Sequence, residues 1–197
     1  MASAAEKQSV DFYFDPVCQW AWRASLWIRE VEKVRPIEVH WKFLSLHAVN
    51  VAAGNEPRPR HQAALNPFRV MTLARRTQGD EAVGRLYLAL GRAWHEDKVD
   101  FLAPDSLENA MDAAGYDPGM LDAALADPTT DEEWKAEEAE MMAVKAVGVP
   151  TLVVDGAAPL FGPVIGSVPT GEEAGELWDH TIWFTRKPYF YEIKRSR

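Results

Sequence analysis

One short segment, FYFDPVCQWAW at residues 12–22, constrains the fold more than any other part of the chain. The run from Val10 to Phe14 alternates and is rich in aromatic residues, which is typical of a strand. The Asp15-Pro16 pair ends that strand. The residues from Gln19 to Val34 are predicted to form a helix. Cys18 is therefore expected where a strand ends and a helix begins.

Cys18 is the single cysteine of the chain. At a helix N-terminus, free backbone N–H groups and the helix dipole favour a negative charge. A thiolate is stabilised there, and the thiolate is the reactive form of cysteine. We therefore interpret Cys18 as a candidate nucleophile. Two observations oppose this reading: a free cysteine is often an inert buried side chain, and the carboxylate of Asp15 disfavours ionisation of a nearby thiol.

Composition excludes several classes of protein. A chain of 197 residues with 47% hydrophobic residues suits one domain with an insertion. A lone cysteine forms no internal disulfide and indicates the cytoplasm, and the first residues show no apolar signal-peptide core. No stretch reaches the roughly 20 apolar residues of a membrane span. The net charge of -9 argues against nucleic acid.

Metal binding is not expected, because the five histidines are scattered and no CxxC or HxxxH pair occurs. A basic cluster is interpreted as a solvent-exposed helical face. Its members are Arg58, Arg60, Arg69, Arg75 and Arg76. As a weaker alternative, Arg58 and Arg60, together with His61 in the same loop, are candidates for holding a carboxylate or a sugar thiol.

The order of predicted elements defines the fold class. Glu38–Leu44 alternates as a second strand and gives a βαβ unit with a parallel strand pair. Asn50–Pro67, with its glycine and prolines, is predicted to be a loop. Helices are expected over Phe68–Arg76, Glu81–Glu96, Ser106–Gly115, Gly119–Ala126, 130–147 and Thr170–Lys187. Strands are expected over Val149–Val154 and Ala157–Phe161. The prediction is an α/β protein with βαβ and ββα halves on one sheet and a helical block between them.

This order resembles the thioredoxin fold in its DsbA-like form. Three stretches carry the resemblance: FYFDPVCQWAW, then GVPTLVV at Gly148–Val154, then LFGP at Leu160–Pro163. The resemblance implies a single domain, with residues 1–50 and 148–197 as thioredoxin core and 51–147 as an all-helical insertion. Trp27–Arg35, Gly171–Asp179 and the ending around Phe190–Arg195 are similar to actinobacterial mycothiol-dependent reductases, including nitroreductases.

One departure from that family affects the chemistry. The usual motif is Cys-x-x-Cys, and here Ala21 stands where a resolving thiol would be. A lone thiol forms a mixed disulfide that a second small thiol resolves. The resemblance thus implies a cytoplasmic thiol-dependent oxidoreductase with Cys18 as monothiol nucleophile. Mycothiol is the first expected co-substrate and glutathione the second, with no bound cofactor.

Further site residues are predicted around Cys18. The resemblance implies a cis Val149-Pro150 bond beside Cys18, with neighbouring backbone pairing to a thiol substrate. Trp20 is interpreted as either a stacking wall or simple packing, whereas Trp22 is expected in the core. His47 and Asn50 follow the second strand, where pocket walls are common, so they are candidates for substrate binding. Residues of this type also cap local turns.

Alternatives remain open at this stage. In a kappa-class glutathione transferase or isomerase, the bound thiol is the nucleophile and Cys18 only donates a hydrogen bond. A binding module without catalysis is a third reading. The expected partners are a small-molecule thiol and a small-molecule or disulfide substrate, without nucleic acid or membrane. A homodimer is left open.

Overall fold

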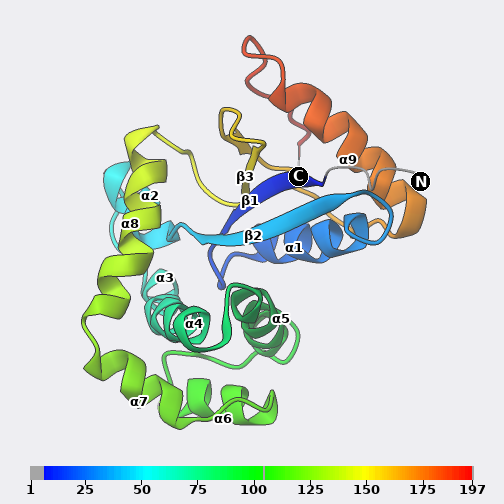
Figure 1. Cartoon of the computed structure of the whole chain (residues 1–197). Helices are drawn as coiled ribbons and strands as arrows, with labels where there is room; N and C mark the ends of the chain where they lie inside the picture. Colours follow the sequence, from blue (N-terminus) through cyan, green and yellow to red (C-terminus); the bar gives the residue numbers. More distant parts are fainter. Residues whose placement is uncertain (1–6, 104, 197) are drawn as a thin grey trace.

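A four-stranded mixed sheet lies at the centre of the protein (Figure 1). The computed structural model describes residues 7–103 and 105–196. The strands β1 (Gln8–Phe14), β2 (Ile37–Phe43), β3 (Thr151–Val154) and β4 (Leu160–Phe161) stand in the order β2-β1-β3-β4. β1 pairs in parallel with β2 and antiparallel with β3, and β4 pairs antiparallel with β3. The predicted α/β class and thioredoxin fold are thus confirmed.

Two helices from opposite ends of the chain pack against each other beside the sheet. The first is α1 (Gln19–Val31), which crosses over between β1 and β2, and the second is α9 (Gly171–Thr185). The buried indole of Trp27 on α1 donates a hydrogen bond to the carbonyl of Ala174 on α9, with 3.1 Å between the two atoms. This contact satisfies a polar atom within an otherwise apolar core.

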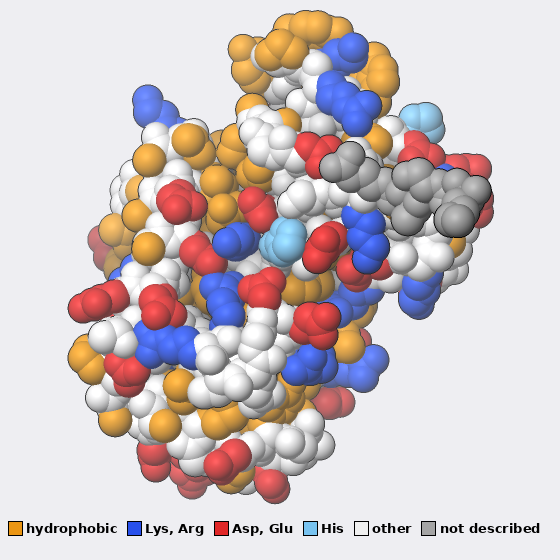
Figure 2. All heavy atoms as spheres, viewed as in Figure 1, with side chains coloured by type: hydrophobic (Ala, Val, Ile, Leu, Met, Phe, Trp, Pro, Cys, Tyr) orange, Lys and Arg blue, Asp and Glu red, His pale blue; other side chains and the backbone are white. Residues whose placement is uncertain are grey.

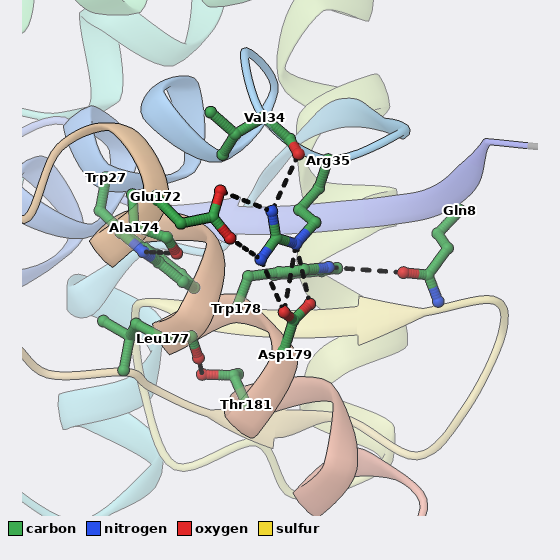
Figure 3. A network of polar contacts seen from close by, with 10 residues as sticks. All are labelled: Gln8, Trp27, Val34, Arg35, Glu172, Ala174, Leu177, Trp178, Asp179 and Thr181. Carbon is green, nitrogen blue, oxygen red and sulfur yellow. Dashed lines mark hydrogen bonds and ion pairs between the residues drawn. The ribbon is translucent and has the colours of Figure 1, made fainter.

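An arginine fastens α9 to the turn that follows α1 (Figure 3). The Arg35 guanidinium donates to both oxygens of Asp179, at 2.7 and 3.0 Å, and to Glu172 at 2.6 Å. Gly175 lies directly beneath it, since an added Cβ there would stand 2.6 Å from the guanidinium carbon. The fork of the arginine therefore fixes how the last helix sits on the core.

A block of helices joins β2 to β3, away from α9 (Figure 1). Within it α4 contacts α5, α7 and α8, while α5 and α8 also reach β2. The block contains α2 (Leu46–Ala52), α3 (Pro59–Gln62), α4 (Leu65–Gln78), α5 (Glu81–His95), α6 (Ser106–Ala113), α7 (Gly119–Ala126) and α8 (Thr129–Ala143).

The predicted loop over residues 50–67 is wrong in part, because the end of α2, all of α3 and the start of α4 fall within it. Ser45 caps α2 by accepting a hydrogen bond from the Ala48 N–H at 3.0 Å. Pro59 and Pro67 each lie in the first turn of a helix, where the N–H that proline lacks has no helical partner. The prolines mark helix starts here rather than loop.

Several predicted ends also differ. α1 stops at Val31 because the N–H groups of Lys33 and Val34 turn back three residues instead of four. The helix predicted over 130–147 ends at Ala143, and the hairpin strand predicted over Ala157–Phe161 is limited to β4.

The basic cluster is not a simple solvent-exposed face. Arg69 forms a two-pronged pair with Asp131, at 2.7 and 2.8 Å, and Arg76 pairs with Glu133 and Asp127. Arg75 pairs with Glu137 at 2.7 Å and donates to the Trp41 carbonyl at 2.6 Å. These arginines therefore hold α8 and the residues just before it against α4. Figure 2 shows basic and acidic side chains interspersed over this part of the surface.

Candidate active site

Cys18 lies at the junction of β1, α1 and the loop before β3. It is the N-cap residue of α1 in an extended conformation, and its N–H donates to the Asp15 carbonyl at 3.0 Å. The side chain is 5% exposed, and its Sγ stands 3.6 Å from the Val149 carbonyl oxygen. The Val149–Pro150 peptide bond is cis. The fold thus brings together Cys18, Val149 and Pro150, which are far apart in sequence.

The thiol of Cys18 is not activated in this structure. Burial raises its pKa to about 11, and the charge of Asp15 adds to the rise. The backbone N–H groups of Ala21 and Trp20 and the guanidinium of Arg60 act in the opposite direction, but they do not compensate for burial. The expectation of a thiolate stabilised by the helix terminus is therefore wrong for this state, because loss of solvation outweighs the helix terminus.

Asp15 organises the loop that carries Cys18. Its carboxylate has no exposed surface and accepts two backbone hydrogen bonds, from Val17 at 2.9 Å and from Leu46 at 2.7 Å. Burial raises its pKa to about 7 even though both hydrogen bonds favour the ionised form. One side chain therefore links the active-site loop to the start of α2. The sequence indicated the charge of Asp15 but not this link.

A cleft opens at the start of α1, between α1, α3 and the end of α5, and Cys18 itself is not among its lining residues. It consists of two adjoining cavities of about 320 Å³ each, which share Gln19, His95 and Lys98. Gln19 directly follows the candidate nucleophile. The other lining residues are Arg60, Trp94, Val99 and Asp100 in one cavity and Trp22, Arg23 and Leu26 in the other. We refer to both cavities together as the cleft.

His95 is the functional candidate that the sequence did not single out. Its Nε2 lies 2.9 Å from the Pro16 carbonyl oxygen, and its ring stacks on Trp22 with 5.6 Å between centroids. A carbonyl oxygen only accepts, so Nε2 carries the proton and Nδ1 keeps its lone pair. Burial lowers the pKa of His95 to about 4, which leaves the ring neutral near pH 7.

The predicted site residues Trp20, His47 and Asn50 are not among the residues that line the cleft. Trp20 is partly buried, with the Arg23 guanidinium 5.2 Å from its ring centroid. Trp22 is buried as expected, yet its ring also lines the cleft. Asn50 turns back on α2 and donates to the Leu46 carbonyl at 2.7 Å. The buried Nδ1 of His47 has no hydrogen-bond partner within the described part of the chain.

In residues 7–103 and 105–196, no group of three or more histidine, cysteine, aspartate or glutamate side chains is arranged to hold a metal ion. No helix in those same ranges has the length and apolar character of a membrane span.

The sheet order, the helical block and a cysteine at the start of α1 facing a proline loop define a DsbA-like protein of the thioredoxin superfamily. Solved structures share the fold. A DsbA oxidoreductase from Xylella fastidiosa has a TM-score of 0.61 at 18% identity, covering 92% of this chain and 88% of that one. The cytosolic disulfide reductase DsbM from Pseudomonas aeruginosa, solved with GSH, has a TM-score of 0.61 at 14% identity, covering 89% of this chain and 99% of that one. A 2-hydroxychromene-2-carboxylate isomerase has a TM-score of 0.64 at 14% identity, covering 89% of this chain and 94% of that one.

The particular family follows from sequence. Residues 17–195 match the family described as Rv2466c-like, mycothiol-dependent nitroreductase Rv2466c. The uncharacterised protein Rv2286c of Mycobacterium tuberculosis is 35% identical over 191 residues, which cover 96% of this chain and 82% of that protein. The chain therefore belongs to the Rv2466c-like family, and it is a thiol-dependent oxidoreductase of the thioredoxin superfamily.

Proposed function

We propose that this protein is a cytoplasmic reductase that uses Cys18 as a monothiol nucleophile and a low-molecular-weight thiol as co-substrate. Mycothiol is the first candidate thiol, because the matching family is described as mycothiol-dependent. Glutathione is the second, because DsbM was solved with GSH. The observation that carries the proposal is the position of the Cys18 sulfur, 3.6 Å from the Val149 carbonyl and next to a cleft.

The proposed reaction with a disulfide substrate proceeds in balanced steps. The Cys18 thiolate attacks one sulfur of the substrate, the substrate S–S bond breaks, and the leaving half departs as a thiol after taking up a proton. The thiol co-substrate, as its thiolate, then attacks the mixed disulfide and releases Cys18. A second co-substrate molecule reduces the resulting mixed product. Two co-substrate thiols are oxidised to one disulfide, and one substrate disulfide is reduced to two thiols.

The raised pKa of Cys18 is compatible with monothiol chemistry through a rare but strongly nucleophilic thiolate. At pKa 11 only about one thiol in 10⁴ is ionised at pH 7, yet a thiolate of high pKa is intrinsically more nucleophilic. In the proposal, the backbone at Val149 and Pro150 orients the bound sulfur compound, Trp20 borders the entrance, and the neutral His95 ring holds the Pro16 carbonyl beside the active-site loop. His47 and Asn50, both on α2, stay proposed substrate-binding residues, with the Asn50 amide donating to the Leu46 carbonyl.

A second candidate function is favoured by one observation. Cys18 is protonated at neutral pH and donates its S–H toward the Val149 carbonyl, as a hydrogen-bonding thiol would. In a transferase or isomerase of the kappa type, such a group holds a bound thiol that is itself the nucleophile.

Turnover by Cys18→Ser distinguishes the two functions. Reduction of a small disulfide would be followed with mycothiol, and separately with glutathione, for the native protein and the variant. The reductase proposal predicts that the serine variant loses at least 100-fold in kcat, because an alcohol cannot form a mixed disulfide. If the variant retained most of the activity, the kappa-type reading would replace it. Ala24→Ser on the same helix controls for added polarity in the buried face.

A further inference from the structure

Three cationic side chains line the cleft without a carboxylate partner. They are Arg60, Lys98 and Arg23. None of them forms an ion pair with any residue in the described ranges, whereas Arg35, Arg69, Arg75 and Arg76 all do. The protein has a net charge of -9, so acidic groups are plentiful. Unpaired cations that line the two adjoining cavities of one cleft therefore indicate a place for an anion.

The other polar groups of the cleft do not cancel this charge. Asp100 is the one acid in its lining, and one of its oxygens already accepts a hydrogen bond from the Leu102 N–H at 3.0 Å. His95 is neutral near pH 7 and is held by Pro16. The lining therefore carries a net positive charge next to Cys18.

Two of these cations, Arg60 and Lys98, also donate hydrogen bonds to backbone carbonyls. Arg60 donates to the Val17 carbonyl at 3.3 Å, one residue before the candidate nucleophile. Lys98 has a backbone φ of +63°, a left-handed conformation that lysine rarely adopts, and its ammonium donates to the His95 carbonyl. A costly backbone conformation that positions a charge at a cleft suggests a role for that charge.

We propose that the cleft selects sulfur compounds that carry a carboxylate, with the anion between Arg60 and Lys98 and the sulfur toward Cys18. This inference rests on the proposed function, whose site it specifies. The carboxylate belongs to the disulfide substrate if the reducing thiol is mycothiol, which carries none, and either to the substrate or to the thiol if the thiol is glutathione. A neutral sulfur compound gains nothing from these cations, so charge rather than size sets the preference.

The test measures binding without turnover, by quenching of the tryptophan fluorescence of the Cys18→Ser protein, since Trp22 and Trp94 line the cleft. One arm compares 3,3′-dithiodipropionate with neutral bis(2-hydroxyethyl) disulfide. The other compares glutathione with its diethyl ester. We expect at least tenfold tighter binding of the carboxylate form in one arm at low salt, and a smaller ratio at 0.3 M salt. The arm that shows it identifies the anionic reactant.

Charge variants link the preference to the cleft. Lys98→Asn removes the ammonium and suits a left-handed φ, so its effect is not a result of backbone strain. We expect Lys98→Asn and Arg60→Gln each to lower the binding ratio about threefold to tenfold. Arg85→Gln, an exposed residue on the same helix as His95, should leave it unchanged. Equal affinities in both arms would overturn the inference. Selective binding combined with absent turnover in the native protein would overturn the proposed function alone.

Discussion

The interface between α4 and α8 and the surroundings of Cys18 use charged residues in opposite ways. At the interface, Arg69 meets Asp131 and Arg76 meets Glu133, each with short, directed hydrogen bonds. Around the cleft, and among the residues that the structure describes, Arg60 and Lys98 bond only to backbone carbonyls. Paired charges fix one helix against another, while unpaired charges remain available to a ligand.

The same contrast holds for the acids. The Arg69 guanidinium holds the pKa of Asp131 well below its usual range. Burial instead raises the pKa of Asp15 and of Cys18. Pairing dominates at the interface and desolvation dominates at the active site, so the two regions should respond differently to pH and to substitution.

The largest expected effect concerns the reactivity of Cys18. With a pKa of about 11, against about 8.5 for free cysteine, its alkylation at pH 7 should be roughly 300-fold slower than that of free cysteine. The rate of reaction with iodoacetamide, measured from pH 6 to 11, gives the midpoint. Asp15→Asn should lower that midpoint, because the neighbouring charge is removed. A midpoint at or below pH 8.5 for the native protein would mean that desolvation does not dominate at the active site, so that the two regions would not differ in this way.

Asp15 should also make stability fall with rising pH. Its folded pKa of about 7 lies above the unfolded value near 3.9, so its contribution is complete below pH 4 and is lost as the pH rises to 7. Within that window the loss approaches about 1.4 kcal/mol per pH unit. Urea unfolding would measure the free energy of unfolding at pH 5 and at pH 7. We expect its decrease between these two pH values to be larger for the native protein than for Asp15→Asn. Equal drops would mean that Asp15 is ionised in the folded state.

Two glycines of α5 provide matched tests of packing, one beside the cleft and one against β2. An added Cβ would lie 2.2 Å from the Trp22 ring at Gly91 and 2.3 Å from the Trp41 indole nitrogen at Gly84. The free energy of unfolding of each alanine variant should be lower by about 1–2 kcal/mol, because the cost of overpacking exceeds the gain in helix propensity. Only Gly91→Ala should also slow turnover, because Trp22 supports His95 in the cleft. Equal loss of turnover in both would show that Trp22 has no local role.

The smallest effects are expected from the ion pairs. Asp131→Asn should cost about 1–2 kcal/mol, because a two-pronged charged contact is weakened in a partly buried place. Arg85→Ala, which breaks an exposed pair with Glu81, should cost under about 0.5 kcal/mol. Thermal unfolding measures both, with mixed-disulfide formation as a control. A change in that control for Asp131→Asn would mean that the interface and the site are coupled.

The sequence predicted what depends on local pattern. The aromatic strand before Cys18, the helix after it and the return of strands near Thr151 follow from periodicity and turn residues. The position of Pro150 beside Cys18 was predicted from the resemblance to known reductases rather than from a local pattern. Helix α2 was missed because nearby glycine and prolines were given more weight than the Ser45 cap.

The electrostatics of the site depend on contacts that no local pattern contains. Asp15 bonds to Leu46, 31 positions away, and His95 bonds to Pro16, 79 positions away. The burial that raises the pKa of Cys18 comes from the packed fold rather than from its neighbours in sequence. The arginines of α4 likewise find their carboxylates on α8 or just before it, more than 50 residues later.

The central claim, that Cys18 forms a mixed disulfide with a small thiol, is tested most directly by intact mass. The native protein would be incubated with oxidised mycothiol, and in parallel with oxidised glutathione, then mapped by peptide digestion. The account predicts one adduct per chain, located on Cys18, that forms faster as the pH rises from 7 to 10 and disappears on addition of the reduced thiol. The absence of any adduct with either compound across that pH range would contradict it.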